Sequence, residues 1–253
     1  MSAVGGRPRL RWTVQEVTAG AAADLDWAMD ELGVFRDAAA EGRPLDDLVR
    51  VYVPEPTVAF GQRDARLPGY EAAARASRER GFAPAVRRAG GRAAAYHHGC
   101  VVVDHLRLED DGALTQKARF AEFADLFVDA FLRAGVPASI GEIPGEYCPG
   151  EYSIRGEGRD HPVKLAGSAQ RVVKGAWLFS THVVVADPLP LREVLVDVYR
   201  ELGMGMDQRT VGAATDVSPG VDVAAFVGAL REEYAAWAGR NGLTLVEVPT
   251  PRH

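Results

Sequence analysis

The chain has 253 residues, of which 47% are hydrophobic and 25% are charged. This composition excludes collagen-like, coiled-coil and largely disordered proteins, and a domain of this length can bury a core without disulfides or a metal. The net charge of −6 provides no overall positive field, so we do not expect a nucleic-acid partner. A local cluster such as Arg87, Arg88 and Arg92 can still form a cationic pocket within an acidic protein.

The only cysteines are Cys100 and Cys148, and neither lies in a CxxC pair or a zinc-type array. We expect no metal site, because His97, His98 and His182 lack HExxH or carboxylate spacing. The chain also shows no secretory leader and no apolar run long enough to span a membrane. These absences predict a cytoplasmic protein without a membrane partner, in a compartment where a free thiol persists.

The first third of the chain predicts a strand, a helix, two strands and a second helix. Residues 10–17 are strand-like, and residues 21–32 have apolar side chains at helical spacing. Residues 48–60 are rich in β-formers but are interrupted by two prolines, which indicates two strands joined by a turn. A helix is predicted from Pro68 to Arg80, with Gly81 ending it.

The rest of the chain predicts more strands, with long helices between and after them. Strands at 85–88 and 93–106 flank a Gly-Gly pair, and a stripe of phenylalanines marks a helix over 113–134. Short strands follow over 140–186, then helices at 191–202 and 221–239 and a strand at 243–248. This order predicts an α+β fold with a mixed, mostly antiparallel sheet flanked by helices.

Cys148 lies in the turn sequence YCPGEY, and it is a candidate nucleophile. A Pro-Gly turn tends to leave its neighbours accessible, and an accessible thiol can react. Cys100, in contrast, begins the apolar run CVVVDHL, where a cysteine behaves as a small buried hydrophobe. From local context alone, an incidental loop cysteine at 148 stays open.

Lys164 begins KLAGSAQR and is the second candidate. Gly167 has no side chain, so the ammonium group can reach a ligand and stabilise a developing oxyanion. A solvated strand lysine is the alternative. His161 lies three residues before Lys164, and a solvent-facing turn is its simplest interpretation.

The segment RRAGGRAAAY, from Arg87 to Tyr96, is the third element. Backbone N–H groups near Gly90 and Gly91 can approach an anionic or carbonyl-bearing ligand. For an isolated Gly-Gly pair, a plain hairpin turn with surface arginines is the simpler interpretation. The segment matches neither the GxxxxGK nor the GxGxxG phosphate-binding pattern.

In this order, TVAFGQ, RRAGGRAAAYHHG and KLAGSAQR resemble the superfamily of lipoate-protein ligases, octanoyltransferases and biotin-protein ligases. GEIPGEYCPGEYSI before KLAGSAQR is most similar to its cysteine-dependent amidotransferases, which move octanoyl groups from the glycine cleavage H protein to lipoyl domains of 2-oxoacid dehydrogenases. The resemblance implies a biotin/lipoyl-protein ligase-like fold. It also implies that Cys148 is the acyl-accepting nucleophile and that Lys164 contacts the acyl carbonyl.

The same resemblance implies an octanoyl or lipoyl cargo, with the H protein and the lipoyl domains as partners and with no cofactor. We expect the substrate-binding residues to be Arg87, Arg88, Gly90, Gly91, Tyr96, Gly167 and Ser168.

The chain departs from the ATP-dependent ligases of this superfamily at several positions. Those ligases typically have RRxGGG and then a histidine, where this chain has Arg92 and Tyr96, and their histidine-glycine pair is replaced by Ser180-Thr181. The accessory domain of many ligases is not apparent either, so residues 1–253 are expected to form one catalytic domain.

Three alternatives remain at this point. The chain can be an ATP-dependent lipoate-protein ligase, in which case ATP and Mg²⁺ are required and Cys148 is incidental. It can take octanoate from acyl carrier protein, or it can be a catalytically silent module that binds an acyl group or a carrier. The sequence does not distinguish octanoyl from lipoyl cargo, and it identifies neither the base that activates Cys148 nor the oligomeric state.

Overall fold

The computed structural model describes residues 8–15, 20–109 and 115–249. Its largest element is an eight-stranded sheet with the strand order β11-β1-β2-β6-β10-β9-β8-β7. These strands are β1 (Arg9–Gln15), β2 (Asp47–Tyr52), β6 (Cys100–Leu108), β7 (Ser139–Ile140), β8 (Ile154–Glu157), β9 (Pro162–Val173), β10 (Ala176–Val184) and β11 (Thr244–Glu247).

Most neighbours in this sheet are antiparallel, as predicted. The run from β2 through β6, β10, β9 and β8 to β7 is antiparallel throughout, whereas β1 pairs in parallel with both β2 and β11. The mixed, mostly antiparallel sheet expected from the sequence is therefore confirmed.

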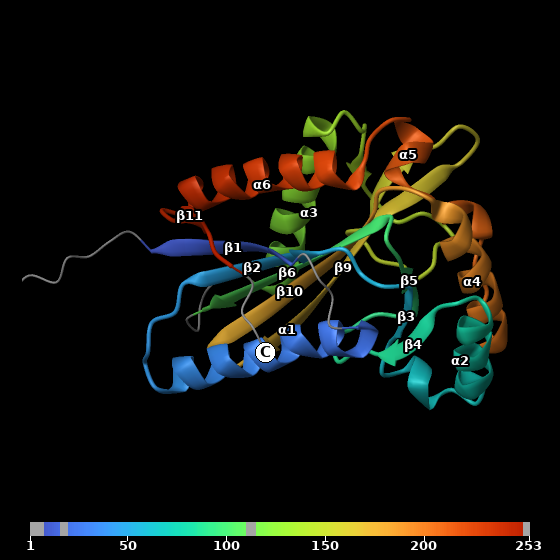
Figure 1. The fold of residues 1–253 in the computed structure, drawn as a ribbon, viewed down its shortest axis with the longest axis horizontal. Helices are drawn as coiled ribbons and strands as arrows, with labels where there is room; N and C mark the ends of the chain where they lie inside the picture. The colour runs from blue at the N-terminus through green and yellow to red at the C-terminus, as the bar shows by residue number, and fades with distance from the viewer. Residues whose placement is uncertain (1–7, 16–19, 110–114, 250–253) are drawn as a thin grey trace, which may run out of the picture.

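Helices cover both faces of the large sheet (Figure 1). On one face, α1 (Ala21–Ala40) buries Trp27, Leu32 and Phe35 against Leu48 and Leu178 of the strands. On the other face lie α3 (Gln116–Arg133) and α6 (Val223–Arg240). Phe123, Phe127 and Phe131 of the α3 stripe are buried in the core between that face and the two helices, which confirms their packing role, whereas Phe120 is only partly buried against this core.

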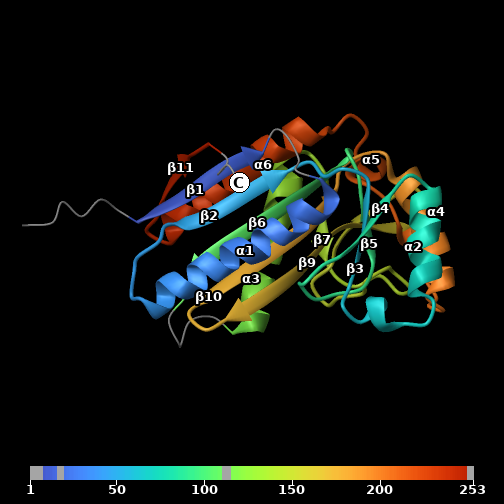
Figure 2. The ribbon, with the colours of Figure 1, turned by 60° about the horizontal axis from the view of Figure 1, so that its bottom comes forward.

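A second sheet of three strands lies at one end of the large sheet (Figure 2). Its order is β4-β3-β5, where the strands are β3 (Thr57–Phe60), β4 (Ala83–Val86) and β5 (Ala94–Tyr96). Helices α2 (Tyr70–Glu79) and α4 (Pro188–Glu201) lie together at this end. The short elements are η1 (Asp64–Arg66), η2 (Gln208–Thr210) and α5 (Ala214–Val217).

The prediction of a single strand over 93–106 was wrong, because two strands, β5 and β6, occupy this region. The chain turns at His97, whose carbonyl accepts a hydrogen bond from the Cys100 N–H at 2.8 Å. At Gly99 a Cβ would lie 2.3 Å from the carbonyl oxygen of Ala186, so the chain passes too close for a side chain there. The turn places β5 in the small sheet and β6 in the large one, just as β3 and β2 belong to different sheets.

Helix α1 continues beyond the predicted 21–32 to Ala40, because Phe35 and Ala38 extend its buried face. The helices predicted at 68–80, 191–202 and 221–239 agree with α2, α4 and α6 within a few residues. The start of the predicted 113–134 helix and the end of the 10–17 strand lie outside the described residues. Among those residues, no helix is long and apolar enough to cross a membrane.

Candidate active site

Cys148 lies in the long connection between β7 and β8, at a strained backbone position. Its φ of 43° is in the left-handed region, which is uncommon for a residue with a side chain. The Cys148 N–H donates to the Tyr199 hydroxyl at 2.8 Å, and that hydroxyl donates to the Ala93 carbonyl at 3.1 Å. Tyr199 thus ties the cysteine to the start of β5 and to α4.

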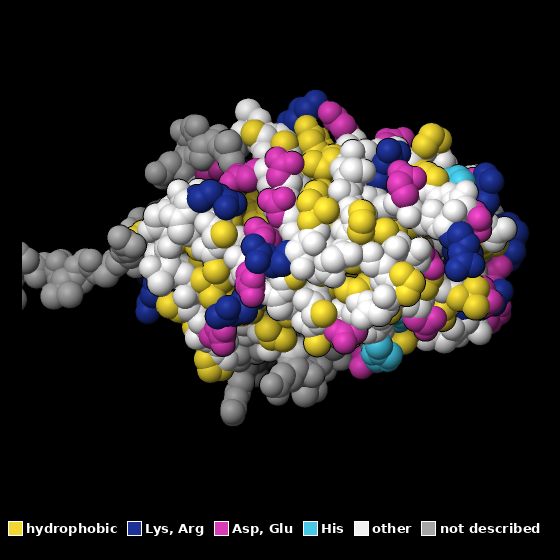
Figure 3. Space-filling view, turned by 90° about the horizontal axis from the view of Figure 1, so that it is seen from above, with side chains coloured by type: hydrophobic (Ala, Val, Ile, Leu, Met, Phe, Trp, Pro, Cys, Tyr) yellow, Lys and Arg dark blue, Asp and Glu magenta, His cyan; other side chains and the backbone are white. Residues whose placement is uncertain are grey.

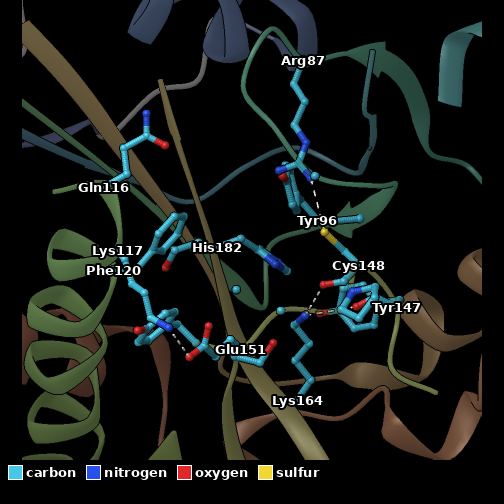
Figure 4. A pocket seen from close by; sticks show the side chains of 18 residues that line it. Arg87, Tyr96, Gln116, Lys117, Phe120, Tyr147, Cys148, Glu151, Lys164 and His182 are labelled. Carbon is cyan, nitrogen blue, oxygen red and sulfur yellow. Dashed lines mark hydrogen bonds and ion pairs between the residues drawn. The ribbon is translucent and has the colours of Figure 1, made fainter. Parts of the chain in front are cut away.

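The thiol faces two hydrogen-bond donors from the segment between β4 and β5, of which Figure 4 shows the Arg87 side chain. The backbone N–H of Arg92 is 3.2 Å from Sγ, and Nη2 of Arg87 is 3.8 Å from it. Arg87 Nη2 also donates to the Arg92 carbonyl at 2.7 Å, which holds the loop in place. The sulfur therefore lies against a cation and a backbone donor.

Gly91 allows this loop to approach the sulfur. Its φ is 100°, and an added Cβ would lie 2.4 Å from Nη2 of Arg87 and 3.0 Å from Sγ of Cys148. The loop is not a simple hairpin, because β4 and β5 pair with opposite edges of β3 and the segment crosses the end of that strand. The hairpin alternative for the Gly-Gly pair is therefore excluded.

Lys164, on β9, lies beneath the cysteine turn and is only 2% exposed. Its Nζ donates to the carbonyl oxygens of Tyr147 and Cys148, at 3.1 and 2.7 Å. A Cβ at Gly167 would lie 3.1 Å from Cε of the lysine, so the glycine leaves the space that the lysine chain occupies. A solvated strand lysine is excluded.

A buried carboxylate, Glu146, accompanies the lysine. One of its oxygens accepts hydrogen bonds from the Gly150 N–H and the Ser153 hydroxyl, and the other lies 3.5 Å from Lys164 Nζ. Burial lowers the pKa of Lys164, and the charge of Glu146 partly opposes this shift. The lysine is therefore easier to deprotonate than a lysine in water.

A cavity of about 460 Å³ opens beside these groups. In Figure 4, Cys148 and Lys164 lie on one side, and Gln116, Lys117 and Phe120 of α3 lie on the opposite side. Lys117 forms a 3.0 Å ion pair with Glu151, and the ring of Phe120 stacks on Tyr152 with centroids 5.9 Å apart. The cavity thus runs from the reactive groups to a far side closed by an aromatic pair and an ion pair. Its lining comprises Arg87, Gly91, Ala94, Tyr96, Gln116, Lys117, Phe120, Tyr147, Cys148, Pro149, Gly150, Glu151, Tyr152, Ser153, Lys164, Gly167, Ser168 and His182.

His182 closes the cavity floor next to Tyr96, with ring centroids 4.4 Å apart. Burial, with the nearby charges of Arg87 and Lys164, lowers the pKa of His182 to about 3. Its Nε2 has no hydrogen-bond partner among the described residues. The ring is therefore neutral at physiological pH. No group of three or more His, Cys, Asp or Glu side chains within the described ranges is placed to hold a metal ion.

The lipoyl protein ligase A/B catalytic domain family matches residues 25–233, most of the chain. The chain belongs to this family. Among curated relatives, it is 30% identical over 176 residues to an octanoyl-[GcvH]:protein N-octanoyltransferase of Geobacillus kaustophilus, covering 70% of the chain and 60% of the relative. It is 26% identical over 174 residues to a lipoyl-[GcvH]:protein N-lipoyltransferase of Listeria monocytogenes, covering 68% of the chain and 60% of that relative. The matched regions thus span about three fifths of these relatives.

Solved members of the ligase group share the fold. The match to a lipoate-protein ligase A bound with ATP covers 98% of this chain and 90% of the ligase chain, with a TM-score of 0.69 and 17% identity. A lipoate protein ligase from Thermoplasma acidophilum, studied with its E2 lipoyl domain, covers 97% of the chain and 88% of its own, with a TM-score of 0.66 and 18% identity. These matches confirm the predicted lipoyl-protein ligase-like fold.

Most residues that the sequence singled out lie together around this cavity: Arg87, Gly91, Tyr96, Cys148, Lys164, Gly167 and Ser168. Arg88 and Gly90 do not line it, and their role in substrate binding stays a prediction. Arg88 instead forms ion pairs with Asp26 and Asp30 of α1, at 3.3 and 2.8 Å, because its side chain points to the other side of the loop from Arg87.

The two remaining sequence candidates lie apart from the cavity lining. Cys100 is fully buried, and burial raises its pKa to about 12, as expected for a packing residue. His161 is half-buried and lies 4.0 Å from Asp207.

Sequence reasoning missed Glu146 and Tyr199, and it weighed His182 only as a metal ligand. Glu146 lies two residues before the cysteine, within the motif itself, so its carboxylate was a signal that could have been used. Tyr199 is on a helix about fifty residues away, and only the fold brings it to Cys148.

Proposed function

We propose that this chain transfers an octanoyl or lipoyl group between lysines of lipoyl carrier proteins, through a thioester on Cys148. The observation that carries the proposal is the thiol at one side of a largely apolar cavity, facing the Arg92 N–H and the Arg87 guanidinium. The names of the curated relatives support octanoyl or lipoyl transfer.

In the first step, the Cys148 thiol gives up its proton, and its sulfur attacks the carbonyl carbon of the acyl-lysine amide beside Lys164. The charged lysine and the loop N–H groups stabilise the oxyanion. The C–N bond then breaks, the proton passes to the leaving amine, and a thioester remains on the enzyme.

In the second step, the lysine amine of the acceptor attacks the thioester carbon. The C–S bond breaks, the amide forms again, and the thiol regains a proton. Forming a thioester from an amide is uphill and the reverse is downhill, so transfer from one lysine to another is close to neutral. We therefore propose that no ATP or other cofactor is required.

The acyl tail lies along the cavity toward Phe120. Each buried CH₂ contributes about 0.8 kcal/mol, so an eight-carbon chain offers several kcal/mol of binding free energy. The stacked rings of Phe120 and Tyr152 provide an apolar contact for the end of the tail. We propose the glycine cleavage H protein as donor and the lipoyl domains of 2-oxoacid dehydrogenases as acceptors, within the cytoplasm.

The proposal is tested by incubating the protein with an octanoylated H protein and an unmodified lipoyl domain, without nucleotide. We expect the lipoyl domain to gain one octanoyl group, measured by intact mass. Product that forms only from free lipoate or octanoate with ATP, with release of pyrophosphate, would instead identify a ligase. Transfer only from octanoyl-acyl carrier protein would reassign the donor. Binding of the octanoylated H protein without turnover would identify a silent module.

A further inference from the structure

A second cavity, of about 500 Å³, lies on the other side of the loop that carries Gly91. It shares Gly91, Cys148 and Pro149 with the acyl cavity, so the two spaces meet at the thiol. Its lining comprises Gln62, Arg63, Arg88, Ala89, Gly90, Gly91, Arg92, Cys148, Pro149 and Arg171. We call it the arginine cavity.

Four arginines and no acidic residue line this cavity. Arg88 and Arg92 are partly neutralised, by the α1 carboxylates and by a 2.9 Å ion pair with the buried Asp64. Arg63 and Arg171 are exposed, and neither has an ion-pair partner within the described ranges. The two come from separate parts of the fold, the turn after β3 and strand β9, and they converge on one space.

The charge of this cavity contrasts with the rest of the molecule. The chain carries a net charge of −6, and on the face covered by α3 and α6 acidic and basic side chains are intermixed (Figure 3). An uncompensated cationic surface beside a reactive thiol attracts an anionic partner to that thiol.

We propose that the arginine cavity is the docking site for an acidic protein surface around the substrate lysine, and that donor and acceptor carriers use it in turn. This inference rests on the proposed function. With the acyl tail in the first cavity and its carbonyl at Sγ of Cys148, the amide nitrogen points toward the second cavity. The lysine arm of either carrier then reaches the thiol from the arginine side.

Sharing one docking site has a kinetic consequence. The donor must leave before the acceptor binds, because both lysine arms require the space next to Cys148. The acyl group stays on the sulfur during the exchange. Ping-pong kinetics follow, and association of both carriers weakens as salt rises because the attraction is electrostatic.

The test is the double charge reversal R63E/R171E, assayed with an octanoylated H protein and an unmodified lipoyl domain at low and high salt. We expect the KM for each carrier to rise about tenfold or more at low salt, with kcat within about threefold, because rim charges act mainly on association. The salt dependence of both KM values should flatten. R240E reverses an exposed arginine at the end of α6 and should leave both KM values unchanged.

Three outcomes would overturn the inference. An unchanged KM for both carriers would show that the arginines do not dock protein. A change for one carrier alone would show that the site is not shared. If ATP competes with both carriers in the wild type but not in R63E/R171E, the cavity is a nucleotide site. Incubation of the wild type with a small octanoyl thioester tests the proposed function separately, because this donor needs no docking site. Failure of the wild type to form an acyl-enzyme from this thioester would contradict the proposed function itself.

Discussion

The two cysteines show how one side chain takes two roles in one fold. Cys100 begins a central strand, is fully buried, and has a pKa raised to about 12 by desolvation. Cys148 lies on a strained turn where two cavities meet, with a backbone N–H and a guanidinium beside its sulfur. The two thiols differ in their surroundings and not in residue type, so changing the groups around Cys148 should make it behave more like Cys100.

The largest effect on octanoyl transfer and on stability is expected from Lys164→Ala, which breaks the buried ion pair with Glu146. Removing the lysine takes away the cation proposed to stabilise the oxyanion, so octanoyl transfer should fall about 10²- to 10³-fold. It also leaves Glu146 buried without its charge partner, which should cost about 3–5 kcal/mol in the free energy of unfolding measured in urea.

The double variant K164M/E146Q separates these two effects, because it removes both charges. We expect it to recover most of the stability of the wild type while transfer stays low. Recovery of transfer together with stability would show that Lys164 acts only by supporting the fold.

A smaller effect is expected from Gly91→Ala. The methyl group would press on Arg87 and Cys148 at a φ of 100°, so the thiol should lose its donors and alkylation of Cys148 by iodoacetamide should slow about tenfold or more. Gly90→Ala is the matched comparison, because its Cβ meets nothing within 4 Å, and it should slow alkylation by no more than about threefold. Equal effects of the two substitutions would contradict the role of loop geometry.

The smallest effect concerns stability against pH, through His182. Its pKa is about 3 in the folded protein against 6.5 in the unfolded chain, so the unfolded state binds more protons below pH 6.5. The stability contributed by neutral His182 is therefore complete above pH 6.5 and is lost as pH falls toward 3. At pH 5 this loss in the free energy of unfolding is about 2 kcal/mol.

His182→Phe keeps an aromatic ring against Tyr96 and removes this titration. Urea unfolding at pH 7 and pH 5 should show a loss for the variant that is about 2 kcal/mol smaller than for the wild type. Burial also lowers the pKa of His105, and this contribution is common to both proteins. Identical pH dependence in the two would contradict a neutral, buried His182.

Much of the site was predictable because its chemistry is local in the sequence. Cys148, Lys164 and Gly167 lie within twenty residues, and the turn and strand that present them are readable from proline, glycine and alternation. Arg87 and Arg88 line different cavities because adjacent side chains on an extended segment point in opposite directions, and the sequence does not say which one faces the thiol.

The parts that were not predictable depend on tertiary packing. Tyr199 reaches Cys148 from α4, and the assignment of β5 and β6 to different sheets depends on the close approach of Gly99 to Ala186. Neither contact leaves a periodic pattern in the sequence. The arginine cavity also depends on tertiary packing, because Arg63 and Arg171 are more than a hundred residues apart in the sequence.

A thioester on Cys148 is tested most directly by the intact mass of the protein after incubation with an octanoylated H protein and no nucleotide. We expect the wild type and Cys100→Ala to gain one octanoyl group that hydroxylamine removes, and Cys148→Ser to gain no hydroxylamine-labile thioester adduct. A thioester adduct that survives Cys148→Ser, or one that is lost in Cys100→Ala when that variant is folded, would contradict the account.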